Sequence, residues 1–290
     1  FNKSHSAAYG LIGYQTAWLK ANHRAEYMAA LMTIESNNTD KVFIYLADCR
    51  RAGLAILPPN TNSSMTGFDV PPDTRKAIRF GLAAVKNVGS SAVTALLEAR
   101  EEAGGCFEDL MDCLERLDYG RINKKVLENL IKCGAFDWTG HPRAALSDNL
   151  EGMLSVAQSN QRSKAAGQVN LFGGMAGGAS VTGYRVPDVA EWPMARKLGF
   201  EREALGFFLS GHPISAWRAE VDRYATCRIE GLQRLDSGQE VAVAGMPSTI
   251  RVVRTRRGDR MAFVTMEDDT SSLECVFFAD PWSTSRRDLE

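Results

Sequence analysis

Residues 82–100 read LAAVKNVGSSAVTALLEAR and set the pattern for the middle of the chain. Apolar residues flank a short polar stretch that runs from Lys86 to Gly89. Within it, Asn87 tolerates the left-handed backbone conformation better than most residues, and Gly89 allows another backbone to approach closely. The pattern therefore predicts helices joined by tight turns, and it continues to Phe136.

The clearest helix of this region lies between a capping residue, Asn123, and a terminating glycine, Gly134. Its apolar residues are spaced so that they share one face, and they are Val126, Leu127, Leu130 and Ile131. The middle of the chain is therefore expected to be helical.

Three further helices are predicted toward the amino terminus. Apolar residues at helical spacing place one over residues 6–22 and start a second near Arg24. A third begins at a cap formed by residues 39–40 and ends near Gly53. The paired prolines of the next segment, AILPPNTNSS, favour extended backbone. A short strand pair is expected after it, around Phe68 and Phe80.

The composition changes near Gly167. Residues 167–183 are rich in Gly and Ala and poor in charge, so they bury too little apolar area to offset their ordering entropy. A mobile linker is expected there. Two helices should follow, over residues 201–210 and 214–224.

The tail has a two-residue hydrophobic period, which is typical of strands. It appears in EVAVAGMPSTIRVVRT, RMAFVTMED and SLECVFF, with turns at residues 258–259 and 270–271. An all-β module of at least three strands is therefore expected from about Gly238. The acidic trio at residues 267–269 is contiguous in a turn, so it is not expected to converge on metal ions.

Length and composition bound the class of protein. The chain has 290 residues, which suggests about two or three domains. Its composition, with 44% hydrophobic and 24% charged residues, is that of an ordinary globular protein. Its net charge of −1 means that nucleic acid could be bound only by local clusters. The six cysteines form no C-x-x-C pair, so no protein-only metal site is expected. No apolar run reaches the ~20 residues that a bilayer helix needs, and no secretion signal opens the chain, so we expect a soluble, cytoplasmic protein without membrane partners.

The opening FNKSHSAAY places Lys3, Ser4, His5 and Ser6 in the first turn of a helix. Unpaired amides and the helix dipole favour an anion at that position, so these residues could hold a phosphate. Alternatively, the serines only cap the helix and Lys3 lies in solvent. The chain begins with Phe1 rather than Met, which suggests a fragment of something larger.

The stretch FNKSHSAAYGLIGYQTAWLKANHRAEYMAALMT resembles the fingers region of the C family of bacterial replicative DNA polymerases. The resemblance implies that Lys3, Ser4, His5 and Ser6 face the incoming deoxynucleoside triphosphate, with Lys3 and His5 donating to phosphate oxygens. Such a role is consistent with the chemistry, because enzymes catalyse phosphoryl transfer mainly by positioning the substrate and neutralising the charge of its phosphates. Tyr9 is a weaker candidate for the same face.

Residues 82–100 are similar to a helix-hairpin-helix element. In that element the hairpin, here Lys86, Asn87, Val88 and Gly89, presents backbone amides to a DNA phosphate without reading sequence. The family pattern often has glycine where this chain has Asn87. This difference bears on whether the hairpin N–H groups donate to a DNA phosphate, and it bears less on whether the helix-hairpin-helix fold forms. VLENLIKCGAFD, with its turn at residues 133–134, is a degenerate second copy. A helical spacer without DNA contacts is the alternative.

QVNLF, residues 168–172, resembles the pentapeptide with which the same family binds its sliding clamp. Leu171 and Phe172 would fill a pocket on the clamp, and Gln168 would fix direction by hydrogen bonding. A linker folded back on itself is the alternative. EREALGFFLSGHP, residues 201–213, also resembles the family, but a core stripe of Leu205, Phe208 and Leu209 explains it without chemistry.

The tail resembles the start of the OB-fold that follows in this family. Its first hairpin carries a cluster of arginines that could bind the phosphate backbone of a single-stranded template. The alternative is that these arginines only form a solvated face of the hairpin. These are Arg251, Arg254, Arg256, Arg257 and Arg260. The chain ends at Glu290, before the closing strands that a complete OB barrel requires.

The sequence thus predicts a multidomain, mainly α protein with a carboxyl-terminal, all-β partial OB-fold. The expected segments are fingers (1–72), tandem helix-hairpin-helix (73–140), helix and Gly-rich linker (141–195), connecting helices (196–237) and partial OB-fold (238–290).

The resemblance implies a DNA-directed DNA polymerase that acts on primer-template DNA and dNTP with a beta sliding clamp and other replicase subunits. Its Mg2+ would be held by palm carboxylates that have no counterpart here, so no catalytic residue is expected in this chain and the chain alone should be inactive. The alternative is a non-enzymatic DNA-binding and clamp-tethering protein, and a third possibility is an inert helical scaffold.

Overall fold

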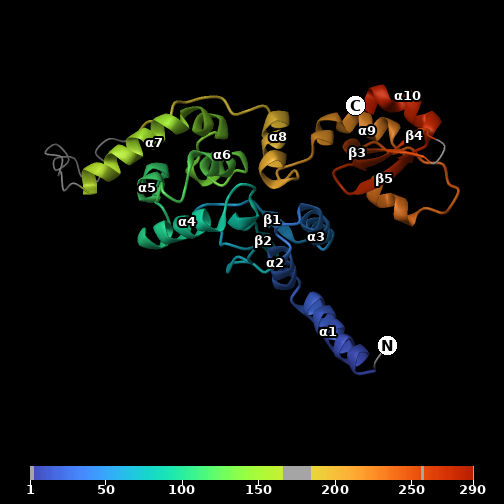
Figure 1. Ribbon diagram of the computed structural model, residues 1–290, viewed down its shortest axis with the longest axis horizontal. Coiled ribbons are helices and arrows are strands. Elements are labelled where there is room, and N and C mark those ends of the chain that lie inside the picture. Colours follow the sequence, from blue (N-terminus) through green and yellow to red (C-terminus); the bar gives the residue numbers. More distant parts are fainter. Residues whose placement is uncertain (1–2, 166–183, 256–257, 290) are drawn as a thin grey trace. The chain divides into compact units, whose positions relative to one another are not determined.

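A computed structural model describes residues 3–165, 184–255 and 258–289 (Figure 1). The chain divides into two compact units, Phe1–Leu209 and Ser210–Glu290. The predicted segment of connecting helices, 196–237, is therefore shared between the two units. In the described residues, no helix combines the length and the apolar character needed to cross a membrane.

The first unit is mainly helical, as predicted. Its helices are α1 (Lys3–Asn22), α2 (Arg24–Ile34), α3 (Thr39–Arg51), α4 (Ser90–Glu102), α5 (Leu110–Arg116), α6 (Lys124–Lys132), α7 (Arg143–Ala165) and α8 (Met194–Leu205), with short 3-10 turns η1 (Leu82–Ala84) and η2 (Asp137–Thr139).

Side-chain caps start several of these helices. The predicted cap at Asn123 is confirmed, since its side chain accepts the N–H of Val126 at 3.0 Å. The cap of α3 is Asn38, which accepts the N–H of Lys41, and not Thr39 or Asp40, which are the first residues of the helix. Our assignment was wrong by one residue because all three side chains are good caps and only the backbone geometry distinguishes them.

The small sheet of the first unit differs from the expected strand pair. Strands β1 (Ala55–Leu57) and β2 (Ala77–Arg79) are parallel, and Asp69 forms a single antiparallel bridge with Arg79. The principal partner of β2 is thus the segment that precedes the prolines, while the residues beside Phe68 contribute one bridge. The rings of Phe68 and Phe80 pack 4.5 Å apart, centroid to centroid.

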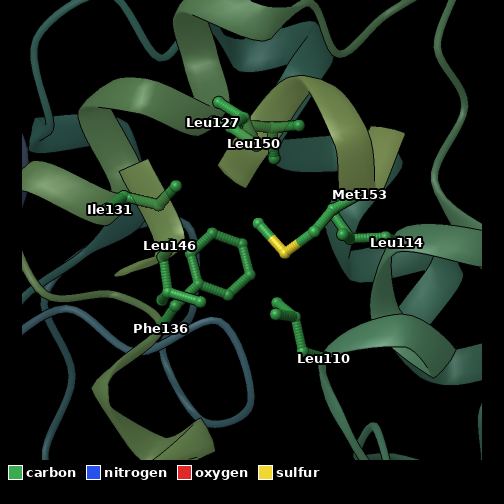
Figure 2. A pocket seen from close by; sticks show the side chains of 8 residues that line it. All are labelled: Leu110, Leu114, Leu127, Ile131, Phe136, Leu146, Leu150 and Met153. Carbon is green, nitrogen blue, oxygen red and sulfur yellow. The ribbon is translucent and has the colours of Figure 1, made fainter. Parts of the chain in front are cut away.

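One continuous apolar core fills this unit. Apolar side chains of α5, α6 and α7, together with Phe136 between α6 and α7, pack around a small apolar cavity (Figure 2). Phe136 and Leu127 there are almost fully inaccessible to solvent. Such burial stabilises the fold by about 1.5–3 kcal/mol for each large side chain.

After the undescribed residues 166–183 the chain returns to the same core. The Tyr184 hydroxyl lies 3.2 Å from Oδ1 of Asn149 on α7, and the Glu191 carboxylate accepts the N–H groups of Arg143 and Ala144 at the start of α7. Helix α8 then packs against α6. The residues between Tyr184 and Leu205 therefore complete the first unit.

The helix predicted over residues 201–210 is displaced. Helix α8 begins at Met194 and ends at Leu205, because Gly206 adopts a φ of 93° and terminates it. Phe207 takes the buried place in the core, with its ring 5.7 Å from that of Phe80. Phe208 is only half-buried and is not part of the core, while Leu209 packs against the core from outside the helix. The predicted stripe was therefore wrong at Phe208 and in being helical beyond Leu205.

The second unit begins with short helices and ends in a sheet covered by a helix. Its elements are η3 (Pro213–Trp217), α9 (Arg218–Tyr224), η4 (Ile229–Arg234), β3 (Met246–Arg254), β4 (Arg260–Glu267), β5 (Ser272–Phe277) and α10 (Ala279–Leu289).

The three strands are antiparallel in the order β3-β4-β5, which confirms the predicted strands and turns (Figure 1). Two differences concern the ends of the module. At its start, the residues of EVAVAG are not in a strand, although Ala242 and Thr226 are joined by hydrogen bonds. At its end, a helix, α10, follows the third strand. Trp282 of α10 packs on Ala262 and Val264 of β4.

Candidate nucleic-acid interface

The hairpin of residues 86–89 forms a turn in front of α4. Asn87 has a φ of 62°, which confirms that it takes the left-handed conformation. The N–H groups of Lys86 and Val88 are used internally, donating to the carbonyls of Ala204 and Val85. The Val88 side chain is buried in the core, whereas Lys86, Asn87 and Gly89 are exposed. The first helix of the expected motif is reduced to the 3-10 turn η1.

The start of α4 offers backbone donors to an anion. Gly89 is its N-cap and supplies no side chain, and Ser90 and Ser91 are exposed. Within the described parts of the chain, no acceptor receives the N–H groups of Gly89, Ser90 or Ser91. Unpaired amides at a helix start attract phosphate, because they point at the ligand and the helix dipole adds partial positive charge.

Arg121 adds a cation beside these amides. Its Nε lies 3.4 Å from Oγ of Ser91, and its Nη1 lies 2.5 Å from a Glu98 carboxylate oxygen. Sequence reasoning missed Arg121, since thirty positions separate it from Ser91 and no local pattern connects them. The other basic side chain of the hairpin, Lys86, is exposed, and its Nζ lies beside Gly206.

The first turn of α1 carries the four polar residues predicted to face a nucleotide. Lys3, Ser4, His5 and Ser6 are all exposed, and the His5 ring packs 4.4 Å from the ring of Tyr9, which is 63% exposed. In the described part of the helix, none of its residues is buried. The arrangement places hydroxyl, imidazole and ammonium groups at one helix start, where they can meet a polyphosphate.

The sheet separates the predicted arginines between its two faces. Arg251 lies opposite Phe263, and Arg254 lies opposite Arg260. Because side chains alternate along a strand, Arg251 and Arg254 point to opposite faces. The predicted residues Arg256 and Arg257 lie outside the described residues.

The acidic residues of the β4–β5 turn are occupied by structural roles. Asp268 is buried and accepts the N–H groups of Ile229, Thr270 and Ser271. Burial opposes its ionisation, but the hydrogen bonds from Thr270, Ile229 and Ser271 outweigh it, so the pKa of Asp268 lies below its usual value. Asp269 pairs with Arg218 at 2.6 Å. Over the described ranges, no group of three possible metal ligands comes together.

Comparison with known proteins connects these features. Residues 53–146 match the family model of the helix-hairpin-helix motif. The chain is 39% identical over 280 residues to DNA polymerase III subunit alpha of Vibrio cholerae, covering 97% of this chain and 24% of that protein. It is 40% identical over 291 residues to the subunit of Escherichia coli K12, covering 100% of this chain and 25% of that protein. The chain is a relative of DNA polymerase III subunit alpha. It spans about a quarter of the length of these relatives.

This relationship to DNA polymerase III subunit alpha confirms the resemblance drawn from the opening stretch. The helix-hairpin-helix motif is also confirmed, together with the mainly α architecture and its small carboxyl-terminal β module. The clamp-binding residues Gln168, Leu171 and Phe172 lie outside the described residues, so their role stays a prediction.

The nucleotide and DNA residues predicted by analogy with subunit alpha also stay predictions. The structure brings Arg121 to Ser91 at the turn that contains Gly89, whereas the Lys86 ammonium lies beside Gly206. The arginines of the sheet belong to the second unit.

Proposed function

We propose that this chain is the part of a bacterial replicative DNA polymerase that receives the incoming nucleotide, holds DNA and reaches the sliding clamp. The observation that carries the proposal is the 40% identity to DNA polymerase III subunit alpha along the whole chain. Similarity that includes every segment favours a polymerase region over an independent clamp-tethering protein. In the parent enzyme the reaction would be template-directed DNA synthesis in the cytoplasm, alongside other replicase subunits.

Each segment has a role in this proposal. The first turn of α1, with Lys3, Ser4, His5 and Ser6, would contact the triphosphate of the dNTP, because an exposed helix start with cationic and hydroxyl side chains neutralises phosphate charge. Residues 168–172 would dock on the clamp, which would raise the effective concentration of the enzyme on DNA.

The hairpin in front of α4 would hold the DNA backbone. The amides of Gly89, Ser90 and Ser91 would donate to a phosphate, with Arg121 adjacent to it and Lys86 exposed on the same hairpin. Such contacts carry no sequence information, as a replicative enzyme requires, since it must bind every template equally.

Mg2+ would act in another part of the parent enzyme. The buried carboxylate of Asp268 accepts hydrogen bonds from the N–H groups of its turn, and Asp269 forms ion pairs with Arg218 and Arg228. These residues do not fit a two-metal site, which needs carboxylates converging on ions. We therefore expect the 290-residue chain alone to extend no primer, and a primer-extension assay showing synthesis would contradict this.

The hairpin role is tested by removing one amide without removing the helix. Ser90 is the first residue of α4, where proline is tolerated, and Gly89 before it has the extended backbone that precedes proline (φ −71°, ψ 159°). Ser90→Pro should weaken binding of primer-template DNA about tenfold, because a hydrogen bond to a charged group contributes about 1.5–3 kcal/mol.

Fluorescence anisotropy with labelled primer-template DNA measures this effect. Ser90→Ala is the matched control, since it loses the hydroxyl and keeps the amide, and it should bind like the parent. Equal affinity of Ser90→Pro and Ser90→Ala, with unchanged melting temperatures, would contradict the hairpin role. Absence of DNA binding by the parent chain even at low salt would contradict the proposed function, because phosphate contacts are strongest there.

A further inference from the structure

The sheet of the second unit has one covered face and one open face. Ala262 and Val264 of β4 are fully buried beneath Trp282 of α10, with Ile250 of β3 beside them. Residues that alternate with these point the other way. The open face therefore carries Arg251 of β3 and its cross-strand neighbour Phe263 of β4.

Arg251 and Phe263 form one contact on this open face. The guanidinium carbon of Arg251 lies 4.5 Å from the centroid of the Phe263 ring, within the distance at which a cation is attracted to an aromatic face. Arg251 is exposed, Phe263 is half-buried, and among the described residues no carboxylate forms an ion pair with Arg251. The cation is thus held by a ring instead of being neutralised by an acid.

The surroundings of this pair are apolar and partly accessible. Val253 and Met261 continue the face toward the hairpin, and Val276 of β5, which lies opposite Phe263, is 43% exposed. The face also has two carboxylates, Glu274 opposite Thr265 and Glu267 opposite Ser272, and neither of them lies opposite Phe263. A planar cation flanked by partly accessible apolar side chains suits a ligand that combines flat aromatic rings with negative charge.

We propose that Phe263 is a positioning residue that holds the Arg251 guanidinium flat on the open face of the sheet, where it binds single-stranded nucleic acid. This inference rests on the proposed function and deepens it by naming the face and the residue that shapes it. Nucleic-acid bases stack on guanidinium planes and on aromatic rings, and phosphates accept hydrogen bonds from the same guanidinium. Arg254, which points to the opposite face with Arg260, would contribute only long-range attraction.

The test uses the whole chain and a fluorescein-labelled oligo-dT in anisotropy titrations at several salt concentrations. Phe263→Leu removes the ring and keeps an apolar side chain, so we expect about fivefold weaker binding with an unchanged salt slope, because the charge of Arg251 remains. Phe263→Tyr keeps the ring and should bind like the parent. Met261→Leu, on the same face, is the control for general repacking.

A double-mutant cycle makes the positioning role specific. Arg251→Gln should weaken binding in both backgrounds, but about fivefold less in Phe263→Leu than in the parent, because the ring acts on binding only through Arg251. Parent-like binding by Phe263→Leu, or failure of Phe263→Tyr to preserve binding, would overturn the inference.

Two outcomes separate this inference from the proposed function. A parent chain that binds primer-template DNA but no oligo-dT would overturn only the inference. A parent chain that binds neither would overturn the proposed function as well. Thermal melting of each variant shows that the comparisons are made between folded proteins.

Discussion

Arg143 of the first unit is a buried cation held by two carboxylates. Its side chain is 3% exposed, and it donates two hydrogen bonds to Asp137 and one to the buried carboxylate of Glu201. Gly134 lies against it with a φ of 83°, and a Cβ added there would lie 2.1 Å from Nη2 of Arg143. Two physical reasons therefore favour glycine at this position: the left-handed backbone conformation and the lack of space for a Cβ beside Arg143.

We expect Gly134→Ala to destabilise the protein by about 3 kcal/mol or more. The left-handed backbone costs an alanine about 1–2 kcal/mol, and displacing Arg143 disturbs a buried ion pair whose rupture costs about 3–5 kcal/mol. Gly140→Ala is the matched control, because Gly140 has a φ of 75° but open space around its Cβ position. Urea denaturation of both variants checks this, and equal losses of stability would show that the contact with Arg143 is unimportant.

At the scale of elements, Asp268 organises the turn between β4 and β5. Its Oδ1 accepts the N–H groups of Thr270 and Ser271 and the hydroxyl of Thr270, while its Oδ2 accepts the N–H of Ile229. One carboxylate thus joins the turn of the sheet to the start of η4. A neutral side chain could satisfy these four donors only in part.

The stability of this turn should depend on pH. The pKa of Asp268 is lowered in the folded protein, so its ionised form stabilises the fold above the usual aspartate pKa of about 3.9, and this contribution is lost as the pH falls through the lower folded value. Asp268→Asn should therefore cost about 1–3 kcal/mol near pH 7, and the difference from the parent should shrink below about pH 4.

Hydrogen exchange of the β4 amides, compared between parent and variant at each pH, measures this difference. Asp259→Asn, in the exposed turn between β3 and β4, is the control and should change little. A difference between parent and Asp268→Asn that stays constant from pH 7 to pH 3 would refute the role of the ionised carboxylate.

At the scale of the whole molecule, the first unit is completed by chain on both sides of residues 166–183. Glu201 of α8 pairs with Arg143 of α7 at 2.9 Å, and the Lys86 N–H donates to the carbonyl of Ala204. The division between the two compact units lies at Leu209 and Ser210. The described residues on either side of 166–183 therefore belong to the same unit.

Cutting the chain within that stretch should leave its two pieces associated. A specific protease site inserted between Gly177 and Gly178 would, after cleavage, produce pieces that elute together in size-exclusion chromatography, because the core and the buried Arg143–Glu201 pair join them. Arg143→Met should make the cleaved pieces separate at a lower urea concentration than in the parent. Pieces of the cleaved parent that elute separately in buffer alone would show that the first unit does not hold together across residues 166–183.

The sequence by itself determined the features that depend on neighbouring residues. Helical spacing and the Asn123 cap specify α6, a two-residue period specifies β3, β4 and β5, and Asn87 marks the left-handed position of the hairpin. In each case the deciding interaction joins residues a few positions apart, so a short window contains all of the information. The family resemblance was carried in the same way, by uninterrupted stretches of sequence.

Only the tertiary structure decided which distant residues meet. It placed Arg121 beside Ser91, put Phe207 rather than Phe208 in the core, and turned Arg251 and Arg254 to opposite faces. These outcomes depend on strand register and on how α8 packs after a long intervening stretch of chain. Periodicity states which residues share a face of one element, but the partner of that face is selected by the packing of the whole core.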